Sequence, residues 1–208
     1  MNGSKGEQSS MRREALLRAA AEEFFERGYV ATSIDAIIQR AGGSKRNIYN
    51  EFGNKEGLFL ALVEANADAA LASLELDEVD SRDLRETLTK FGLHLLAVYM
   101  SPTLIGIYRT IVTEATRFPD LAKSFYERGP GRTTLRLAVV LETAKERGEI
   151  KSDDTLRLAG HFVGMIRDNL HLQVILGLRA PPSVAEAREA VVSAVEVFLN
   201  GAVSRNST

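Results

Sequence analysis

The chain contains no cysteine, and only three of its 208 residues are histidine. The absence of cysteine excludes disulfide bonds and thiolate metal sites, and it fits a reducing compartment. The histidines, His94, His161 and His171, do not have the HExxH spacing of a zinc site, and the sequence has neither a nucleophile elbow nor a phosphate-cradling glycine loop. We therefore expect no metal, no cofactor and no catalytic residues, which makes an enzyme the least favoured class of protein.

We also expect neither a targeting segment nor an unbroken membrane span. Its first ten residues, MNGSKGEQSS, are polar, so we expect no secretion signal. Residues 91–108 carry no Asp, Glu, Lys or Arg over 18 positions, close to the length of a spanning helix. Ser101 and Pro102 interrupt this stretch, because proline suits a first helical turn and disfavours helix in the residue before it. We expect two buried helix halves in a cytoplasmic protein that does not contact a membrane.

Strong basic charge is absent as well. The formal net charge is −2. Residues 1–60 hold nine Lys/Arg and eight Asp/Glu, giving +1, and the remainder holds seventeen against twenty, giving −3. Any surface for nucleic acid must therefore come from the local placement of charged side chains rather than from bulk basicity.

Helical periodicity runs through the whole chain, whereas strand signals are scarce, so the sequence predicts an all-α fold. Glycine and proline separate the predicted helices from one another. The Gly129-Pro130-Gly131 triplet is expected to be a kinked corner rather than a mobile joint. The predicted helices cover residues 12–27, 33–41, 45–52, 55–76, 82–100, 103–117, 119–128, 133–147, 154–178 and 183–202.

The first three helices, with a two-glycine turn before the third, fit a helix-turn-helix unit. Thr32 is the expected N-cap of the second helix, with Asp35 as the acidic half of a capping box. Ser44 is the expected N-cap of the third helix, which ends at Gly53. The chemistry of this third helix decides whether the unit is more than a small bundle.

At about 100° per residue, the third helix places apolar residues on one face and donors on the other. Ile48 and Phe52 face inward, and Tyr49 and Glu51 lie on opposite shoulders. The outward residues, which can form bidentate bonds with base edges, are Arg46, Asn47 and Asn50. The side chains suited to phosphate oxygens are Ser44, Lys45, Tyr49 and Lys55, and the exposed N–H groups near Thr32, Ser33 and Lys55 can add to them. The alternative is that these residues form an ordinary solvated face.

The surrounding residues resemble the N-terminal domain of TetR-type transcriptional repressors. The matching segments are Gly28-Tyr29, Thr32 to Ile37, Ala41 to Lys45, Ile48-Tyr49 and Phe52 to Phe59. Glycines, caps and the Tyr-x-x-Phe and Lys-Glu-x-Leu-Phe motifs fall in register over about a quarter of the chain. The resemblance implies that the third helix binds double-stranded operator DNA.

Two residues depart from the pattern of this family. Gly43 stands where a branched apolar residue is common, which predicts looser packing of the turn. Glu51 stands where His or Tyr is common, and a phosphate would repel its carboxylate. Glu51 can accept a bond from a cytosine amine, pair with Lys55 or face water, and the last two are favoured.

The resemblance further implies a homodimer that binds a palindromic operator and is released by a small effector. We expect the chain to consist of a disordered arm (1–10), the helix-turn-helix domain (11–60), an effector-binding and dimerisation domain (61–202) and a disordered tail (203–208). The last two helices, 154–178 and 183–202, would form the dimer's four-helix bundle, although an apolar stripe also suits intramolecular core.

A mostly apolar effector pocket with a few orienting polar groups is expected in the larger domain. His94, Tyr108 and Asn169 are the candidate polar groups, and an apolar or aromatic effector would suit the rest. Simple core filling is the alternative for each residue. The candidate pocket residues are Phe91, His94, Leu95, Met100, Ile107, Tyr108, Ile111, Phe125, Phe162, Met165 and Asn169.

The main rival to a ligand-released repressor is a DNA-binding architectural protein or interaction module that does not switch. Such a protein would prefer one DNA sequence only weakly, whereas a specific regulator favours its site over bulk DNA by about 10³-fold or more.

Overall fold

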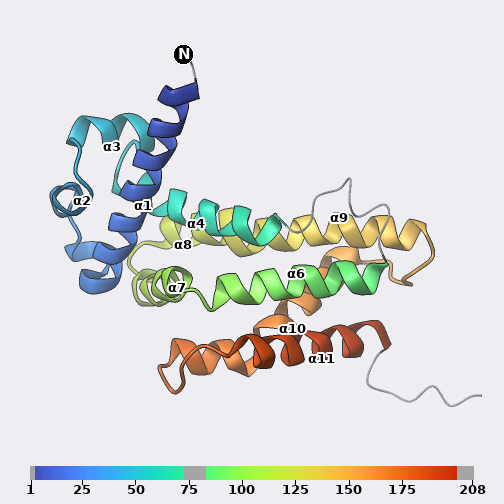
Figure 1. Ribbon diagram of the computed structural model, residues 1–208. Helices are drawn as coiled ribbons and strands as arrows, with labels where there is room; N and C mark the ends of the chain where they lie inside the picture. Colours follow the sequence, from blue (N-terminus) through green and yellow to red (C-terminus); the bar gives the residue numbers. More distant parts are fainter. Residues whose placement is uncertain (1–2, 73–82, 201–208) are drawn as a thin grey trace, which may run out of the picture. The chain divides into compact units, whose positions relative to one another are not determined.

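The computed structural model describes residues 3–72 and 83–200, in which all regular structure is helical (Figure 1). The all-α prediction is thereby confirmed. The helices in chain order are α1 Gly3–Ala31, α2 Ile34–Ala41, α3 Lys45–Phe52, α4 Lys55–Leu71, α6 Leu84–Tyr99, α7 Pro102–Glu114, α8 Pro119–Tyr126, η1 Glu127–Gly131, α9 Arg132–Glu146, α10 Thr155–Ile175 and α11 Val184–Asn200.

The ends of α1 differ from the sequence prediction. The helix begins at Gly3, so the predicted disordered arm over residues 1–10 is helical from Gly3 onward. Gly28 interrupts α1 with a φ of 77°, as expected of a helix-ending glycine, and a further short turn follows it. The predicted extension of α4 to Leu76 and the predicted tail over 203–208 lie outside the described residues.

The chain folds as two compact units that are not divided at the predicted boundary near residue 61. The first unit contains residues 1–66 and 102–129, so α7 and α8 belong with the three helices of the helix-turn-helix. The second unit contains residues 67–101 and 130–208. Two separated stretches of sequence therefore build each core.

Aromatic side chains form the core of the first unit. The ring of Phe24 lies 5.3 Å from that of Phe59, centroid to centroid, and the ring of Tyr29 lies 5.5 Å from Phe59 and 5.6 Å from Phe118. Helices α1 and α7 approach closely at Gly106, where an added Cβ would lie 2.1 Å from the ring of Phe25. A larger residue at position 106 would therefore push α7 away from α1.

The core of the second unit lies where α6 packs on α10 and α11 and α10 packs on α9. Within this unit Figure 1 shows α6 running alongside α11. The ring of Phe162 lies 6.3 Å from that of Phe91 on α6 and 4.9 Å from that of Phe198 on α11, centroid to centroid. Phe162 thus joins three helices of the unit.

The uncharged stretch over residues 91–108 is divided between α6 and α7 at Ser101 and Pro102, as the position of the proline predicted. Among the described residues no single helix is long and apolar enough to cross a membrane, and α6 and α7 reach that length and composition only together, as a bent pair. The glycine-proline corner at residues 129–131 is part of η1, a short π-helical segment that follows α8.

Candidate nucleic-acid interface

The connection from α1 to α2 is fixed by two hydroxyl side chains with different roles. Ser33 is the N-cap of α2, and its Oγ accepts a hydrogen bond from the backbone N–H of Ala36 at 3.1 Å. Thr32 is buried, and its hydroxyl donates toward the carbonyl oxygens of Glu23 at 2.9 Å and Gly28 at 2.8 Å. The prediction of Thr32 as the N-cap was therefore wrong by one residue. Its own backbone N–H donates to the carbonyl oxygen of Gly28 at 3.2 Å, so any phosphate contact by N–H groups here is left to the residues that follow.

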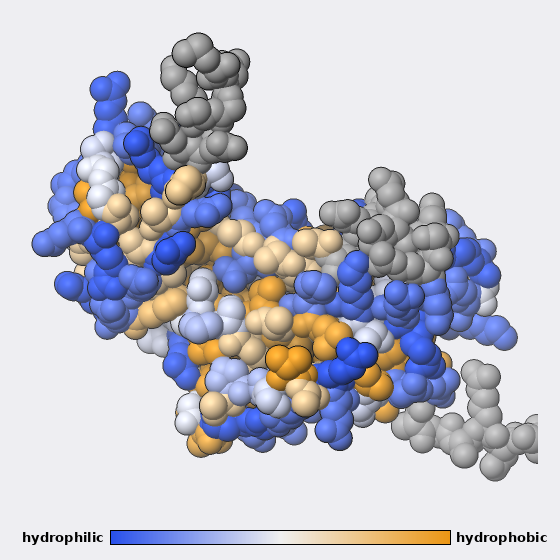
Figure 2. All heavy atoms as spheres, in the orientation of Figure 1, coloured by the Kyte–Doolittle hydropathy of each residue, from blue (hydrophilic) through white to orange (hydrophobic). Residues whose placement is uncertain are grey.

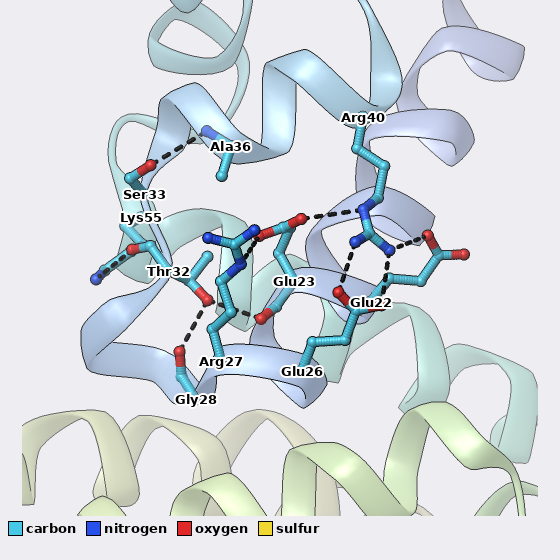
Figure 3. Close-up of polar contacts among 10 residues, drawn as sticks. All are labelled: Glu22, Glu23, Glu26, Arg27, Gly28, Thr32, Ser33, Ala36, Arg40 and Lys55. Atoms are coloured by element: carbon cyan, nitrogen blue, oxygen red, sulfur yellow. Dashed lines mark hydrogen bonds and ion pairs between the residues drawn. The ribbon is translucent and has the colours of Figure 1, made fainter.

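A cluster of carboxylates on α1 holds Arg40, at the end of α2, through all three guanidinium nitrogens (Figure 3). Nη1 lies 2.9 Å from Glu22 Oε2, Nη2 lies 2.6 Å from Glu26 Oε2, and Nε lies 3.0 Å from Glu23 Oε1. The bond from Arg40 lowers the pKa of the Glu26 carboxyl, and the bonds to Glu26 and Glu22 raise the pKa of Arg40. This cluster orients α2 on α1.

Glu23 is the buried member of the cluster, with 3% of its side chain exposed. Its second oxygen, Oε2, lies 3.0 Å from Nε of Arg27, one turn further along α1. A buried carboxylate is costly unless cations or donors compensate its charge, and Arg27 and Arg40 provide that compensation.

The turn from α2 to α3 requires glycine. Gly42 and Gly43 have φ values of 75° and 109°, in the region that side chains with a Cβ rarely adopt. The departure from the family pattern at Gly43 therefore comes with a backbone conformation that a branched residue would strain. Ser44 then caps α3 as predicted, with its Oγ accepting from the N–H of Asn47 at 3.3 Å.

The faces of α3 agree with the helical periodicity at most positions. Ile48 is completely buried, whereas Phe52 is half-buried. Arg46 and Asn50 are exposed on the opposite side, and Asn47 is half-buried on one shoulder. Tyr49 on the other shoulder is 50% exposed. The donors of Arg46 and Asn50 therefore point to solvent from a helix that is anchored by Ile48.

Lys45, at the start of α3, forms an exposed ion pair with Asp35 of α2. Its Nζ lies 2.9 Å from Asp35 Oδ1, and this bond raises the pKa of Lys45. Exposed pairs of this kind contribute little to stability because water and salt screen them. The ammonium can therefore exchange Asp35 for a phosphate oxygen.

Lys55 was predicted to contact a phosphate, but in the structure its ammonium group binds backbone carbonyl oxygens. Its Nζ donates to the carbonyl oxygens of Tyr29 at 2.7 Å, Thr32 at 2.9 Å and Val30 at 3.3 Å, and it lies 4.7 Å from the centroid of the Tyr29 ring. Burial lowers the pKa of this ammonium. With three donor protons and three carbonyl acceptors, Lys55 ties the start of α4 to the end of α1.

Glu51 pairs with Arg13 of α1, a partner that the sequence did not predict. Glu51 Oε1 lies 3.3 Å from Arg13 Nε, and the Arg13 guanidinium lies over the ring of Phe52 at 5.7 Å from its centroid. The predicted alternatives were Lys55, water or a base. Helical periodicity could not identify Arg13, because it reports faces within one helix and not contacts between two helices.

The candidate pocket residues are distributed over both units. His94 and Asn169 are exposed, and His94 Nδ1 lies 2.9 Å from the carbonyl oxygen of Lys90 on its own helix, so neither residue is an enclosed orienting group. The first unit holds Ile107, Tyr108, Ile111 and Phe125; all but Tyr108 are buried, and the Tyr108 and Phe125 rings lie 6.4 Å apart. The second unit holds Phe91, His94, Leu95, Met100, Phe162, Met165 and Asn169.

Two hollows in the structure are lined by other residues. A groove of about 210 Å³ in the first unit lies between α1 and α7, and one of about 600 Å³ in the second unit lies beside α9. Neither is lined by any of the predicted pocket residues. In the described ranges, no three His, Asp or Glu side chains are grouped so that they could hold a metal ion.

Comparison with known proteins gives matches along most of the chain. Residues 16–62 match the family described as bacterial regulatory proteins, tetR family, and residues 86–201 match the C-terminal domain of AefR-like transcriptional repressors. Similar curated proteins include the transcriptional activator FasR of Mycolicibacterium smegmatis, 38% identical over 77 residues, and the repressor NicS of Pseudomonas putida, 33% identical over 92 residues. The alignments cover 37% and 43% of this chain and 35% and 43% of those proteins, so the chain spans less than half of their length.

Solved structures extend the similarity to nearly the whole chain. A TetR-family regulator from Mesorhizobium loti is 28% identical with a TM-score of 0.76, and the match covers 92% of this chain and 96% of that one. The flavonoid-responsive regulator FrrA is 32% identical with a TM-score of 0.71, and the match covers 95% of this chain and all of FrrA. Together with the geometry of α2 and α3, these matches show that the chain belongs to the tetR family of bacterial regulatory proteins.

Proposed function

We propose that the protein is a ligand-responsive transcriptional repressor that binds a palindromic operator as a homodimer. The observation that carries the proposal is the exposed donor face of α3, where Arg46 and Asn50 point away from the buried Ile48. A helix anchored in this way fits the major groove, which is about 12 Å wide, with its outward side chains at the base edges.

The donors divide into two groups by position. Arg46 and Asn50 point directly outward and are assigned to base edges, Arg to guanine and Asn to adenine, with Asn47 at the margin of this face. Ser33, Ser44, Lys45 and Tyr49 lie at the rim and are assigned to phosphate oxygens. Thr32 and Lys55 support the interface from inside the protein and are not assigned to DNA.

The dimer is assigned to α10 and α11. Leu172 near the end of α10 and Leu176, the residue that caps this helix, are both exposed in the single chain. Val184, Val192 and Val197 are exposed on α11, and Figure 2 shows apolar residues along the surface where α6 and α11 run. Burying such side chains against a second copy is favourable, and a two-fold dimer reads a two-fold operator.

The effector is proposed to be a small apolar or aromatic molecule. The support comes from the AefR-like repressor match over residues 86–201 and from FrrA, which is described as flavonoid-responsive. A site beside the aromatic cluster of Phe91, Phe162 and Phe198 would have to open on binding, because Phe91 and Phe162 are completely buried and line neither hollow. Binding would release the operator only through a higher affinity for the conformer that does not fit DNA.

A competition gel shift tests the DNA-binding part of this proposal. The probe is the DNA upstream of the protein's own coding sequence, and the competitor is an excess of bulk duplex. A specific regulator should bind the probe about 10³-fold more tightly than bulk DNA, so the shift should persist in the presence of the competitor. Complete loss of the shift under competitor would instead identify a non-switching architectural DNA-binding protein.

The proposed repressor acts on DNA in the cytoplasm, and we assign it no catalytic role.

A further inference from the structure

The guanidinium of Arg13 lies beside the recognition helix without being part of it. Arg13 belongs to α1, and its Nε lies 3.3 Å from Oε1 of Glu51 on α3. The same guanidinium lies over the Phe52 ring, 5.7 Å from the centroid. The Arg13 side chain nevertheless remains 44% exposed, and that of Glu51 35% exposed. Two contacts thus hold a cation at the surface.

The position of Glu51 on α3 places this cation on one side of the helix. At about 100° per residue, Lys45 and Tyr49 lie on one shoulder of α3 and Asn47 and Glu51 on the other. A helix with its side chains is about 10–12 Å across, nearly the width of the major groove. The two phosphate strands that border the groove therefore run along both shoulders.

The two shoulders differ in what they offer a phosphate. Lys45 and Tyr49 carry an ammonium and a hydroxyl, which can both donate. On the opposite shoulder the carboxylate of Glu51 can only accept, and a neighbouring phosphate would repel it. Arg13 supplies the cation that this shoulder lacks.

The guanidinium has donors left for a ligand after its contact with Glu51. The ion pair uses Nε, and in the part of the chain that the structure describes Nη1 and Nη2 of Arg13 have no recorded hydrogen bond. A planar guanidinium binds phosphate oxygens through two parallel N–H donors. Because Phe52 and Glu51 already restrict the side chain, less conformational entropy is lost when it binds.

We propose that Arg13 binds a phosphate of the DNA backbone beside α3, and that Glu51 is the residue that positions it. This inference rests on the proposed function, because it requires α3 to enter the major groove. Glu51 then has a role although its charge is opposite to that expected beside DNA: it orients Arg13, which lies between the carboxylate and the phosphate. The contact carries no base preference, since it is made to the backbone.

The test compares Arg13→Gln with the wild-type protein on two duplexes, one selected by the wild-type protein from a random-sequence library and one scrambled version of it. Loss of one charged contact should weaken binding about tenfold on both duplexes. The slope of log K against log salt should decrease in magnitude by about 0.9. Arg128→Gln is the matched control, because Arg128 forms a similar exposed pair with Glu64 on α4. It should change neither quantity.

The positioning role of Glu51 is tested by a double-mutant cycle. Without Arg13, Glu51 faces a phosphate alone, so Glu51→Gln should strengthen binding in the Arg13→Gln background. With Arg13 present, the same substitution should give a clearly smaller gain or a loss, because it also releases the guanidinium. Thermal unfolding without DNA checks that all variants are folded.

Three outcomes separate this inference from the proposed function. If the wild-type protein selects a sequence but Arg13→Gln binds it with unchanged affinity and salt slope, the phosphate contact is wrong and the regulator stands. If Arg13→Gln has the expected effect but the cycle shows no coupling, Glu51 does not position Arg13. If the wild-type protein selects no sequence, the proposed function fails and the inference fails with it.

Discussion

At the scale of single residues, the positively charged side chains around α3 and α4 differ in the acceptors that already bind their N–H groups. Lys45 pairs with one exposed carboxylate, and Lys55 is held by three carbonyl oxygens and an aromatic ring. The first arrangement is easily exchanged for a phosphate, whereas the second is a support at the end of α1. We therefore expect Lys45 and Lys55 to have different roles, although both belong to one motif.

Replacing Lys55 by Gln should therefore destabilise the protein without changing the number of phosphates that it binds. We expect the free energy of unfolding to decrease by about 1–2 kcal/mol, because three carbonyl oxygens lose a charged donor. Chemical denaturation measures this change, and a salt titration of DNA binding should give an unchanged slope. Lys45→Gln is the control, with unchanged stability and a slope smaller by about 0.9. A reduced slope with unchanged stability for Lys55→Gln would restore its predicted phosphate contact.

At the scale of elements, the orientation of α2 on α1 depends on the carboxylate cluster around Arg40. Glu22 and Glu26 are about half exposed where they bond Arg40, whereas Glu23 is buried between Arg27 and Arg40. The buried member has the larger effect on stability, because its removal leaves both cations without their enclosed partner.

Glu23→Gln should lower the free energy of unfolding by about 1–3 kcal/mol, because the neutral amide no longer balances the charges of Arg27 and Arg40 and turns an N–H donor toward one of them. Glu22→Gln is the matched control on the same Arg40 and should cause a smaller loss, because its side chain is about half exposed. Chemical denaturation of both variants at one pH measures the difference. Equal losses for the two would mean that burial does not distinguish them.

Helix α10 contains a buried histidine, His171, and we expect it to make the second unit sensitive to acid. Burial, with a smaller contribution from Arg167, lowers the pKa of His171 to about 4 from its ordinary 6.5. The folded state therefore holds the ring neutral between these values while the unfolded state protonates it. The free energy of unfolding is therefore unaffected by His171 above pH 6.5, and it decreases as the pH falls from 6.5 toward 4.

His171→Leu should remove this part of the acid sensitivity. We expect the wild-type protein to lose about 1–2 kcal/mol more than the variant between pH 6.5 and 4, after allowance for solvent screening. Thermal unfolding over this pH range measures the loss. His161→Gln, at an exposed position of the same helix, should follow the wild-type curve. Parallel curves for wild type and His171→Leu would contradict the assignment.

The sequence predicted the helices of the fold better than it predicted the side-chain contacts between them. Periodicity and glycine punctuation located α3 and the helix break at Pro102, because both depend on local backbone preference. The N-cap of α2 was misplaced from Ser33 to Thr32, since either hydroxyl can cap and only packing buries Thr32. Arg13 was missed because its partner lies 38 residues away, on another helix.

The candidate pocket was also predicted only in part, because it depends on contacts between helices. Aromatic residues on the predicted helices indicated a core, but composition does not say which polar side chains turn inward. His94 and Asn169 lie on α6 and α10 as predicted, yet both are exposed. The rotation of each helix about its axis is set by the helices packed against it, and a single helix in the sequence does not contain that information.

At the scale of the whole molecule, binding of a palindromic operator requires two copies of the chain. A palindromic operator places its half-sites about 34–36 Å apart, which one α3 cannot span. The exposed leucines of α10 offer an interface of apolar character. Disruption of that interface should therefore abolish cooperative operator binding while leaving each chain folded.

Leu172→Glu should convert the proposed dimer to a monomer, because a charge buried in an apolar interface is costly. Analytical ultracentrifugation measures the mass in solution, and circular dichroism checks that the helices are intact. Leu135→Glu on α9 is the matched control, since Leu135 is 57% exposed and Leu172 is 53% exposed. A Leu172→Glu protein that remains dimeric would place the interface elsewhere.

The central claim is that the outward residues of α3 read a DNA sequence, and selection of duplexes from a random library tests it most directly. The wild-type protein should enrich one near-palindrome with half-sites about one helical turn apart. Arg46→Ala or Asn50→Ala should relax the preference at one position of each half-site by about 1–3 kcal/mol, whereas Lys45→Ala should weaken all sequences equally. An unenriched library, or an unchanged preference in the Arg46→Ala and Asn50→Ala proteins, would contradict the claim.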